Sequence, residues 1–94
     1  MEIRGFRSKA LRRFWDDGTT RGLPVQNTRR LEVVLAFLAQ METVDDFLAL
    51  PRGRPHRLIG DRAGTYAYDV SGNWRLTFSV ESDGIIDLDL EDYH

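Results

Sequence analysis

Residues 65–90 read TYAYDVSGNWRLTFSVESDGIIDLDL, and the alternation of apolar and polar side chains predicts three antiparallel strands. Ser71-Gly72-Asn73 and Asp83-Gly84 supply the residue types that tight hairpin turns require. One face of the resulting meander would be apolar and would need a second layer to cover it. The side chains expected on this inward face are Tyr66, Tyr68, Val70, Trp74, Leu76, Phe78, Val80, Ile86, Leu88 and Leu90.

The first half of the chain predicts the helices of that second layer. Ser8 is a typical N-cap for a helix over Lys9–Asp16, and Gly18 follows its end. Pro24 suits the first turn of a second helix, which runs to about Gln40. Helical periodicity gives this second helix an apolar stripe of Leu31, Val34, Leu35, Leu38 and Met41.

Three short elements complete the predicted architecture. Thr43-x-x-Asp46 resembles a capping box, so a turn of helix should begin there and end near Leu48. Short strands are expected at Ile3–Phe6 and at Arg57–Ile59. The whole chain, residues 1–94, is therefore predicted to be one α+β domain, in which two N-terminal helices pack on a small antiparallel sheet.

Composition restricts the class of protein. The chain has 94 residues, of which 41% are hydrophobic, and the absence of cysteine excludes disulfides and thiolate metal sites. The first residues, MEIRGFR, lack the apolar run of a signal peptide. No apolar stretch approaches the ~20 residues of a membrane span. We therefore expect a cytoplasmic protein that does not enter a membrane.

The charged residues are distributed unevenly along the chain. The net charge is -2, yet all 13 basic residues lie in residues 1–75, and 12 of them are Arg. Residues 76–94 carry 6 of the 15 acidic residues. Arg binds phosphate and carboxylate groups bidentately. Because an acidic average opposes non-specific RNA binding, any RNA contact is expected to use a local cluster of Arg.

Polar side chains on the meander and beside its ends include the groups that metal-free RNA cleavage requires. RNA cleaves itself once its 2′-hydroxyl is deprotonated and its phosphate is held, so a protein must supply a base, an acid and cations. His titrates near neutral pH, and Arg clamps phosphate. The residues of this hypothetical ribonuclease site are His56, Arg75, Asp92, Tyr93 and His94.

Asp87, Asp89 and Glu91 offer an alternative, because carboxylates on one strand face can hold Mg²⁺ together with a His. The roughly 6–7 Å between alternate residues of a strand makes joint ligation of one ion awkward. A solvated edge that pairs with Arg side chains is the simpler interpretation, and no cofactor is expected.

Five segments resemble the HigB-type toxins of bacterial toxin–antitoxin pairs, which belong to the RelE superfamily. They are FRSKALRRFW from Phe6, GTTRG from Gly18, HRLIGD from His56, GNWRLTF from Gly72 and the terminal EDYH. The resemblance runs from near residue 3 to the last residue. Its specific part is the Asn-Trp-Arg-x-x-Phe segment followed, at the right separation, by Asp-Tyr-His.

The resemblance implies a RelE-like fold and a ribosome-dependent endoribonuclease that cuts mRNA in the A site. It also implies a HigA-like helix-turn-helix antitoxin as the partner. The toxin would contact operator DNA only through this antitoxin. His56, Arg75, Asp92, Tyr93 and His94 fall on the family's active-site positions, and which of His56, Tyr93 and His94 is base or acid stays open. Cleavage would leave a 2′,3′-cyclic phosphate or a 3′-phosphate.

One position departs from the family pattern, because Ile59 stands where the family often has a Lys that contacts phosphate. Arg57 is the preferred replacement, since strand alternation would align it with position 59, and Arg62 is the second candidate. Arg12 and Arg13 are expected to contact ribosomal RNA. A toxin that has lost cleavage and keeps only antitoxin binding is the alternative function.

Overall fold

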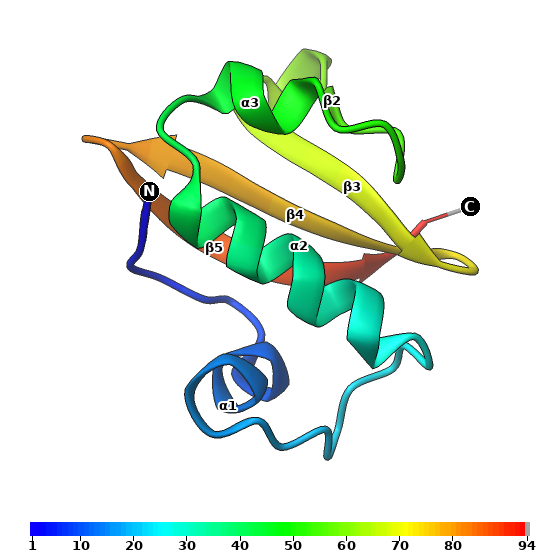
Figure 1. Ribbon diagram of the computed structural model, residues 1–94. Helices are drawn as coiled ribbons and strands as arrows, with labels where there is room; N and C mark the ends of the chain where they lie inside the picture. The colour runs from blue at the N-terminus through cyan, green and yellow to red at the C-terminus, as the bar shows by residue number, and fades with distance from the viewer. Residues whose placement is uncertain (94) are drawn as a thin grey trace.

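The computed structural model describes residues 1–93, in which five strands form one sheet in the order β1-β5-β4-β3-β2 (Figure 1). β1 runs parallel to β5, and the other neighbouring strands are antiparallel. The elements are β1 (Glu2–Ile3), α1 (Lys9–Asp17), α2 (Thr28–Gln40), α3 (Val44–Leu48), β2 (His56–Arg57), a 3₁₀ turn (Gly60–Arg62), β3 (Thr65–Ser71), β4 (Trp74–Glu81) and β5 (Gly84–Asp92). This arrangement confirms the predicted α+β class.

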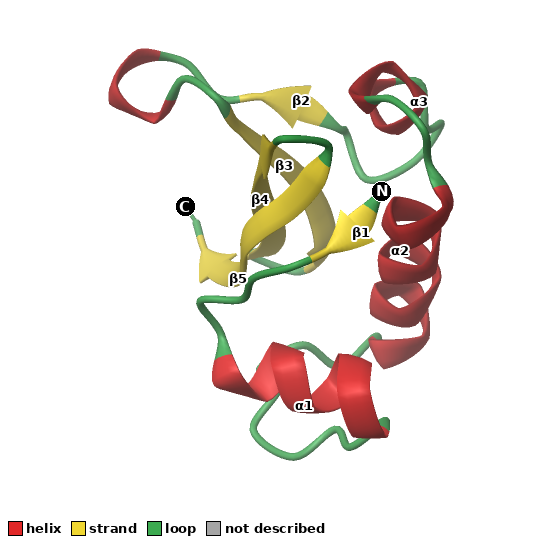
Figure 2. Ribbon diagram, turned by 90° about the vertical axis from the view of Figure 1, so that its left-hand side faces the viewer, coloured by secondary structure: helices red, strands yellow, loops and turns green. Residues whose placement is uncertain are grey.

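The hydrophobic core lies between the helices and one face of the sheet. Figure 2 shows the sheet with α2 and α3 on the same side of it. Phe47 of α3 is fully buried, and its ring meets the ring of Phe78 edge-on, with 5.0 Å between centroids. The stripe predicted for α2 is confirmed, because Leu31, Val34, Leu35, Leu38 and Met41 are all buried.

The predicted caps of α1 and α3 are confirmed. The hydroxyl of Ser8 accepts a hydrogen bond from the backbone N–H of Leu11 at 3.0 Å. Gly18 ends α1 with a φ of 76°, a left-handed conformation that glycine adopts without strain. Thr43 and Asp46 form the capping box at the start of α3. These local interactions fix where both helices begin or end.

The start of α2 differs from the prediction. The helix begins at Thr28, where the side chain of Asn27 accepts a hydrogen bond from the N–H of Arg30 at 3.0 Å. Pro24 therefore lies in the preceding loop and not in the first turn. An Asn N-cap satisfies a free N–H of the first turn, which Pro at the first helical position cannot do.

The expected inward position of Ile86 is wrong, because β5 contains a bulge. Thr77 pairs with Asp89, whereas Ser79 pairs with Ile86, so β5 has one extra residue between these two pairs. Asp87 lies at this point with a φ of 56°. An extra residue reverses the alternation of a strand, so Ile85 is fully buried while Ile86 is half-buried.

The two short strands are shorter than predicted. β1 ends at Ile3, and Phe6 rejoins β5 only through a single parallel bridge to Leu88. β2 ends at Arg57, because the chain turns into the 3₁₀ helix at Gly60, whose φ is 72°. Ile59 therefore lies outside the sheet and is 89% exposed.

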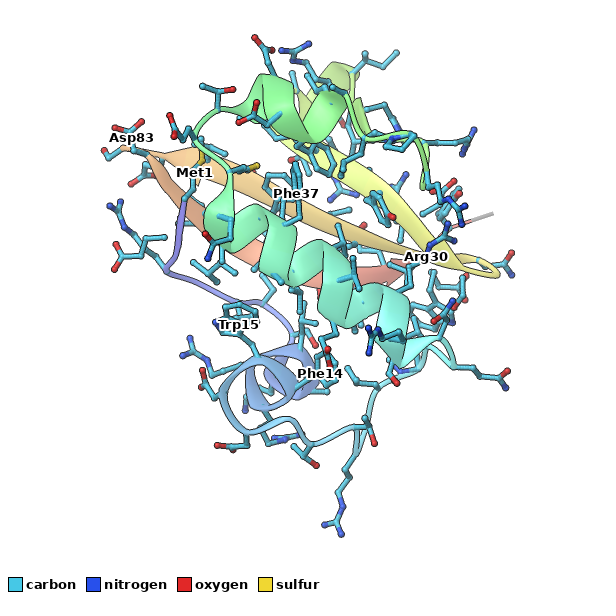
Figure 3. The ribbon with its side chains drawn as sticks, in the orientation of Figure 1. Met1, Phe14, Trp15, Arg30, Phe37 and Asp83 are labelled. Atoms are coloured by element: carbon cyan, nitrogen blue, oxygen red, sulfur yellow. The ribbon has the colours of Figure 1, made fainter. Side chains whose placement is uncertain are left out.

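The amino group of Met1 caps the C-terminal end of α2. The amino group of Met1 donates hydrogen bonds to the carbonyl oxygens of Leu38 and Ala39 at 3.1 and 3.2 Å (Figure 3). These carbonyls belong to the last turn of the helix, where a positive charge is favourable. Among the helices of residues 1–93, none combines the length and the apolar character needed to cross a membrane.

Candidate active site

The face of the sheet opposite α2 and α3 gathers polar side chains from β2, β3, β4 and β5. Strand register places Arg75 between Asp69 and Glu91. In the neighbouring row, Ala67 of β3 pairs with His56 of β2 on one side and with Thr77 of β4 on the other. Because side chains of alternate strand residues share a face, these rows form one polar surface, which we call the open face.

Arg75 lies at the centre of the open face. Its side chain is only 16% exposed, and its guanidinium carbon lies 4.8 Å from the centroid of the Tyr93 ring. This distance is typical of a cation–π contact, which orients the guanidinium group over the ring. The Nε atom is buried without a hydrogen-bond partner among residues 1–93, so Arg75 keeps donor capacity for a ligand.

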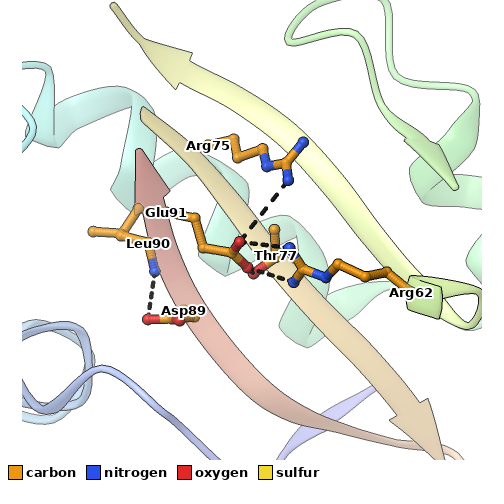
Figure 4. A network of polar contacts seen from close by, with 6 residues as sticks. All are labelled: Arg62, Arg75, Thr77, Asp89, Leu90 and Glu91. Atoms are coloured by element: carbon orange, nitrogen blue, oxygen red, sulfur yellow. Dashed lines mark hydrogen bonds and ion pairs between the residues drawn. The ribbon is translucent and has the colours of Figure 1, made fainter. Parts of the chain in front are cut away.

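Glu91 accepts hydrogen bonds from two side chains on the open face (Figure 4). Both terminal nitrogens of Arg62 donate to its two oxygens, at 2.6 and 2.7 Å. The hydroxyl of Thr77 donates at 2.5 Å, and Arg75 Nη2 lies 3.9 Å from Glu91 Oε1. The hydrogen bonds from Arg62 lower the pKa of Glu91 to about 2, against the opposing effect of burial.

A second cluster connects Arg54, His56, Asp69 and Tyr93. Arg54 Nε donates to Asp69 Oδ2 at 2.7 Å, and Arg54 Nη2 donates to the Tyr93 hydroxyl at 3.2 Å. Nδ1 of His56 lies 2.6 Å from the backbone carbonyl oxygen of Arg54. Burial acts to raise the pKa of Asp69, but the interactions with Tyr93 and Arg54 outweigh it and lower that pKa. Arg54 therefore holds Tyr93 and His56 in one region.

The structure brings together three of the five predicted catalytic residues. His56, Arg75 and Tyr93 lie on or beside the open face and are connected through the contacts described above. Asp92 pairs in register with Trp74, so it lies on the opposite face from Arg75. His94 lies outside the described residues. The catalytic roles of all five residues stay predictions.

The expected alignment of Arg57 with position 59 is wrong, because β2 ends at Arg57. The guanidinium of Arg57 lies 5.9 Å from the centroid of the Tyr66 ring and 4.0 Å from Asp45 of α3. These partners are on the helix-covered side, whereas Arg62 reaches the open face. Placement thus favours Arg62 as the cation near the predicted phosphate site, while the phosphate contact itself stays a prediction.

Arg12 and Arg13, which we expected to contact ribosomal RNA, lie on α1 and not on the sheet. Both are exposed, and the guanidinium of Arg12 lies 5.1 Å from the centroid of the Phe6 ring. Their predicted contact with the ribosome is compatible with this exposure and stays a prediction.

Sequence reasoning missed Arg54 and Asp69. Asp69 lies between two inward residues of β3, so strand alternation already placed it on the same face as Arg75, and this signal was available. Arg54 carried no such signal, because it lies in a loop before β2. Among residues 1–93, no three His, Asp or Glu side chains gather as a metal site.

The acidic residues of β5 agree with the simpler interpretation, in which a solvated edge pairs with Arg side chains. Glu91 pairs with Arg62 of the same chain. Asp87 Oδ1 lies 3.6 Å from Arg7 Nε. The negative charge near the C-terminal end is therefore partly neutralised within the protein.

Glu91 should make the stability of the protein fall in acid. Its pKa is about 2 in the folded protein, against an ordinary value of 4.5. A carboxylate with a lowered folded-state pKa stabilises the fold above its unfolded-state pKa and loses this contribution as pH falls toward its folded-state pKa. Urea unfolding at pH 7, 5, 4 and 3 should therefore show wild type and Glu91→Gln converging as pH falls below about 5. A constant difference over this range would contradict the assignment.

A small sheet with helices on one face is also the fold of solved bacterial toxin structures. The YoeB–YefM toxin–antitoxin complex from Staphylococcus aureus contains a chain that matches with a TM-score of 0.58 and 16% identity, over 100% of this chain and 99% of that one. The YoeB/ParE toxin from Agrobacterium tumefaciens matches with a TM-score of 0.54 and 13% identity, over 97% and 99%.

Sequence comparison identifies the family within this class. The family model of the RelE-like toxin HigB, of type II toxin–antitoxin systems, matches residues 4–94. Endoribonuclease HigB from Proteus vulgaris is 33% identical over 94 residues, which cover 98% of this chain and 99% of that protein. The chain therefore belongs to the HigB-like family of toxins.

Proposed function

We propose that this endoribonuclease of the HigB family cuts messenger RNA in the ribosomal A site and thereby stops translation. The observation that carries the proposal is the convergence of His56, Arg75 and Tyr93 on the open face of a HigB-like fold. Residues 1–94 would act as one toxin domain, because the helices and the sheet share a single hydrophobic core.

The proposed reaction is transesterification within the RNA. A base removes the proton of the 2′-hydroxyl, O2′ attacks the adjacent phosphorus, and the bond from phosphorus to O5′ breaks as an acid protonates O5′. His56, Tyr93 and His94 are the proposed proton-transfer groups, with Asp92 beside them in sequence. Arg75 would stabilise the negative charge of the phosphorane. No metal is needed, because the substrate carries its own nucleophile.

Binding to the ribosome is proposed to use exposed Arg side chains. Arg12 and Arg13 lie on α1, and Arg57 lies at the exposed end of β2. Such contacts to RNA phosphates weaken as salt rises. A chain of net charge -2 has little general affinity for free RNA, so the ribosome would position the message.

The proposed partner is a HigA-like helix-turn-helix antitoxin. Membership of a toxin–antitoxin family supports an antitoxin partner, and the similar Staphylococcus aureus structure is itself a toxin–antitoxin complex. The antitoxin would neutralise the toxin and would provide the only contact with operator DNA. Since translating ribosomes are cytoplasmic in bacteria, the proposed site of action is the cytoplasm.

The test is cleavage of a labelled mRNA by purified protein, with and without programmed ribosomes. We expect cleavage only with ribosomes, and we expect 5′-hydroxyl ends beside cyclic or 3′-phosphate ends. A message with a 2′-deoxynucleotide at the cut position should stay intact, because it lacks the nucleophile. Cleavage of naked RNA at the same rate would contradict ribosome dependence, and 5′-phosphate ends would indicate metal-assisted hydrolysis.

A toxin that has lost cleavage is the second candidate function, and Ile59 at the usual Lys position is the observation that favours it. Induction in cells separates the two candidates. An active toxin arrests growth, and His56→Ala should relieve the arrest. A protein that only binds antitoxin is harmless, and the same substitution changes nothing.

A further inference from the structure

We propose that Arg62, Arg75 and Thr77 form a subsite for an RNA phosphate, and that the Glu91 carboxylate fills this subsite in the free protein. The inference rests on the proposed function, because it states where the substrate of that reaction would bind. It also assigns Glu91 a role, as an internal competitor that the substrate must displace.

The geometry around Glu91 is that of an anion site. Arg62 donates from both terminal nitrogens to both carboxylate oxygens, at 2.6 and 2.7 Å. Carboxylate and phosphate present the same pair of oxygens to such a planar fork, so the group that holds one can hold the other. Thr77 adds a third donor, since its hydroxyl lies 2.5 Å from Glu91 Oε2.

Arg75 shows that the carboxylate does not use the whole subsite. Its Nη2 atom lies 3.9 Å from Glu91 Oε1, which is too far for a hydrogen bond, and its buried Nε has no partner among residues 1–93. A phosphate has more acceptor oxygens than a carboxylate. It can therefore accept from Arg62, Thr77 and Arg75 at the same time, whereas the Glu91 carboxylate does not.

Space for a phosphate lies directly beside the carboxylate. A polar pocket of about 180 Å³ is lined by Arg62, Thr77 and Glu91, and its lining also includes Arg7 and Asp87. Beyond the bridge at Leu88, β5 pairs only with β4 in the described part of the chain. Glu91 therefore lies near an open edge of the sheet, and its side chain can turn outward without breaking a strand pairing.

Charge makes the two occupants mutually exclusive. A phosphodiester and the Glu91 carboxylate each carry one negative charge, and at contact distance they repel each other. Exchanging one for the other keeps the charge of the subsite unchanged. Free RNA would then compete poorly with an attached carboxylate, whereas mRNA held in place on the ribosome would compete well.

The experiment is an NMR titration with inorganic phosphate at constant low ionic strength, followed on the guanidinium signals of Arg62 and Arg75. Glu91→Gln and Glu91→Ala should each bind phosphate about tenfold or more tightly than wild type, since phosphate no longer displaces a charge-assisted pair. Asp89→Asn is the matched control: Asp89 lies two residues away on the same strand and acts on Arg62 through its charge, but no hydrogen bond or ion pair joins the two among residues 1–93. The phosphate affinity of Asp89→Asn should therefore change much less than that of the Glu91 variants.

Combining Glu91→Gln with Arg62→Gln should remove the gain in affinity. Equal phosphate affinity of Glu91→Gln and Asp89→Asn would overturn the proposal, because the gain would then reflect net charge alone. Glu91→Gln and Glu91→Ala both remove the carboxylate, so the comparison with Asp89→Asn can be made as long as one of the two variants folds.

The titration contains no ribosome, so this inference and the proposed function can fail separately. If Glu91→Gln gains phosphate affinity but no form of the protein cuts mRNA, the anion subsite stands and the proposed function fails. If wild type cuts mRNA on ribosomes but Glu91→Gln gains no affinity, only the subsite fails.

Discussion

Arg75→Ala should lower ribosome-dependent mRNA cleavage by about 10²–10³-fold, which is the usual effect of removing one donor that stabilises transition-state charge. Arg75 is the most central cation of the open face, and its side chain is largely buried above the Tyr93 ring. A buried, oriented guanidinium acts on the phosphorane with little reorganisation. Single-turnover cleavage rates at saturating ribosome concentration measure the effect on the chemical step.

Two further variants make this result specific. Arg75→Lys keeps the charge but loses the planar fork, so its rate should lie between those of wild type and Arg75→Ala. Arg21 is exposed in the loop after α1, and Arg21→Ala should cleave at the wild-type rate. A Lys variant with the wild-type rate would show that only charge matters at this position. Urea unfolding of each variant separates loss of activity from loss of fold.

Phe47→Ala should reduce the free energy of unfolding by about 3–5 kcal/mol, as large-to-small substitutions of buried aromatic residues do. Phe47 is fully buried, and its ring lies 6.3 Å from the rings of both Tyr66 and Tyr68 in addition to the contact with Phe78. α3 has five residues, and Phe47 is its only buried side chain. Domains of this kind have only about 5–15 kcal/mol of stability, so the variant should be close to unfolding.

Val33→Ala is the matched control for the core prediction. Val33 lies on α2 but is 55% exposed, so its truncation should change the unfolding free energy by less than about 0.5 kcal/mol. Urea denaturation at neutral pH measures both variants. A loss below about 1 kcal/mol for Phe47→Ala would show that α3 is held by other contacts.

Local sequence signals predicted the elements that depend on neighbouring residues. Ser8, Gly18 and the Thr43–Asp46 capping box act within one turn of helix, and all three were found where expected. The alternation of the meander placed Leu76 and Phe78 in the core for the same reason, since a strand with one buried face repeats every second residue.

The errors occurred where the outcome depends on distant residues or on backbone irregularity. The bulge at Asp87 reversed the side of Ile86, although a run of Ile-Ile-Asp-Leu allows either Ile to face inward. β1 pairs with β5 across 82 positions of sequence, from Glu2 to Gly84, and no local pattern in two residues specifies such a partner.

The candidate site shows the same division. Arg75 and Tyr93 were expected from strand alternation and family resemblance, and the structure stacks one on the other. Arg54 joined them only through the loop before β2. Asp92 was expected in the site with Arg75, but it pairs with Trp74, so the register places it on the opposite face of the sheet from Arg75.

The sequence by itself determined the class of fold, the family, and the types of group that could act on RNA. Periodicity, capping residues and short motifs are properties of neighbouring residues, and they need no knowledge of distant contacts. The tertiary structure alone decided which charges meet. Arg62 and Glu91 are 29 residues apart, and their bidentate pair exists because the 3₁₀ turn brings the guanidinium over β5. Long charged side chains can reach many partners, so only the path of the backbone selects the one that they bind.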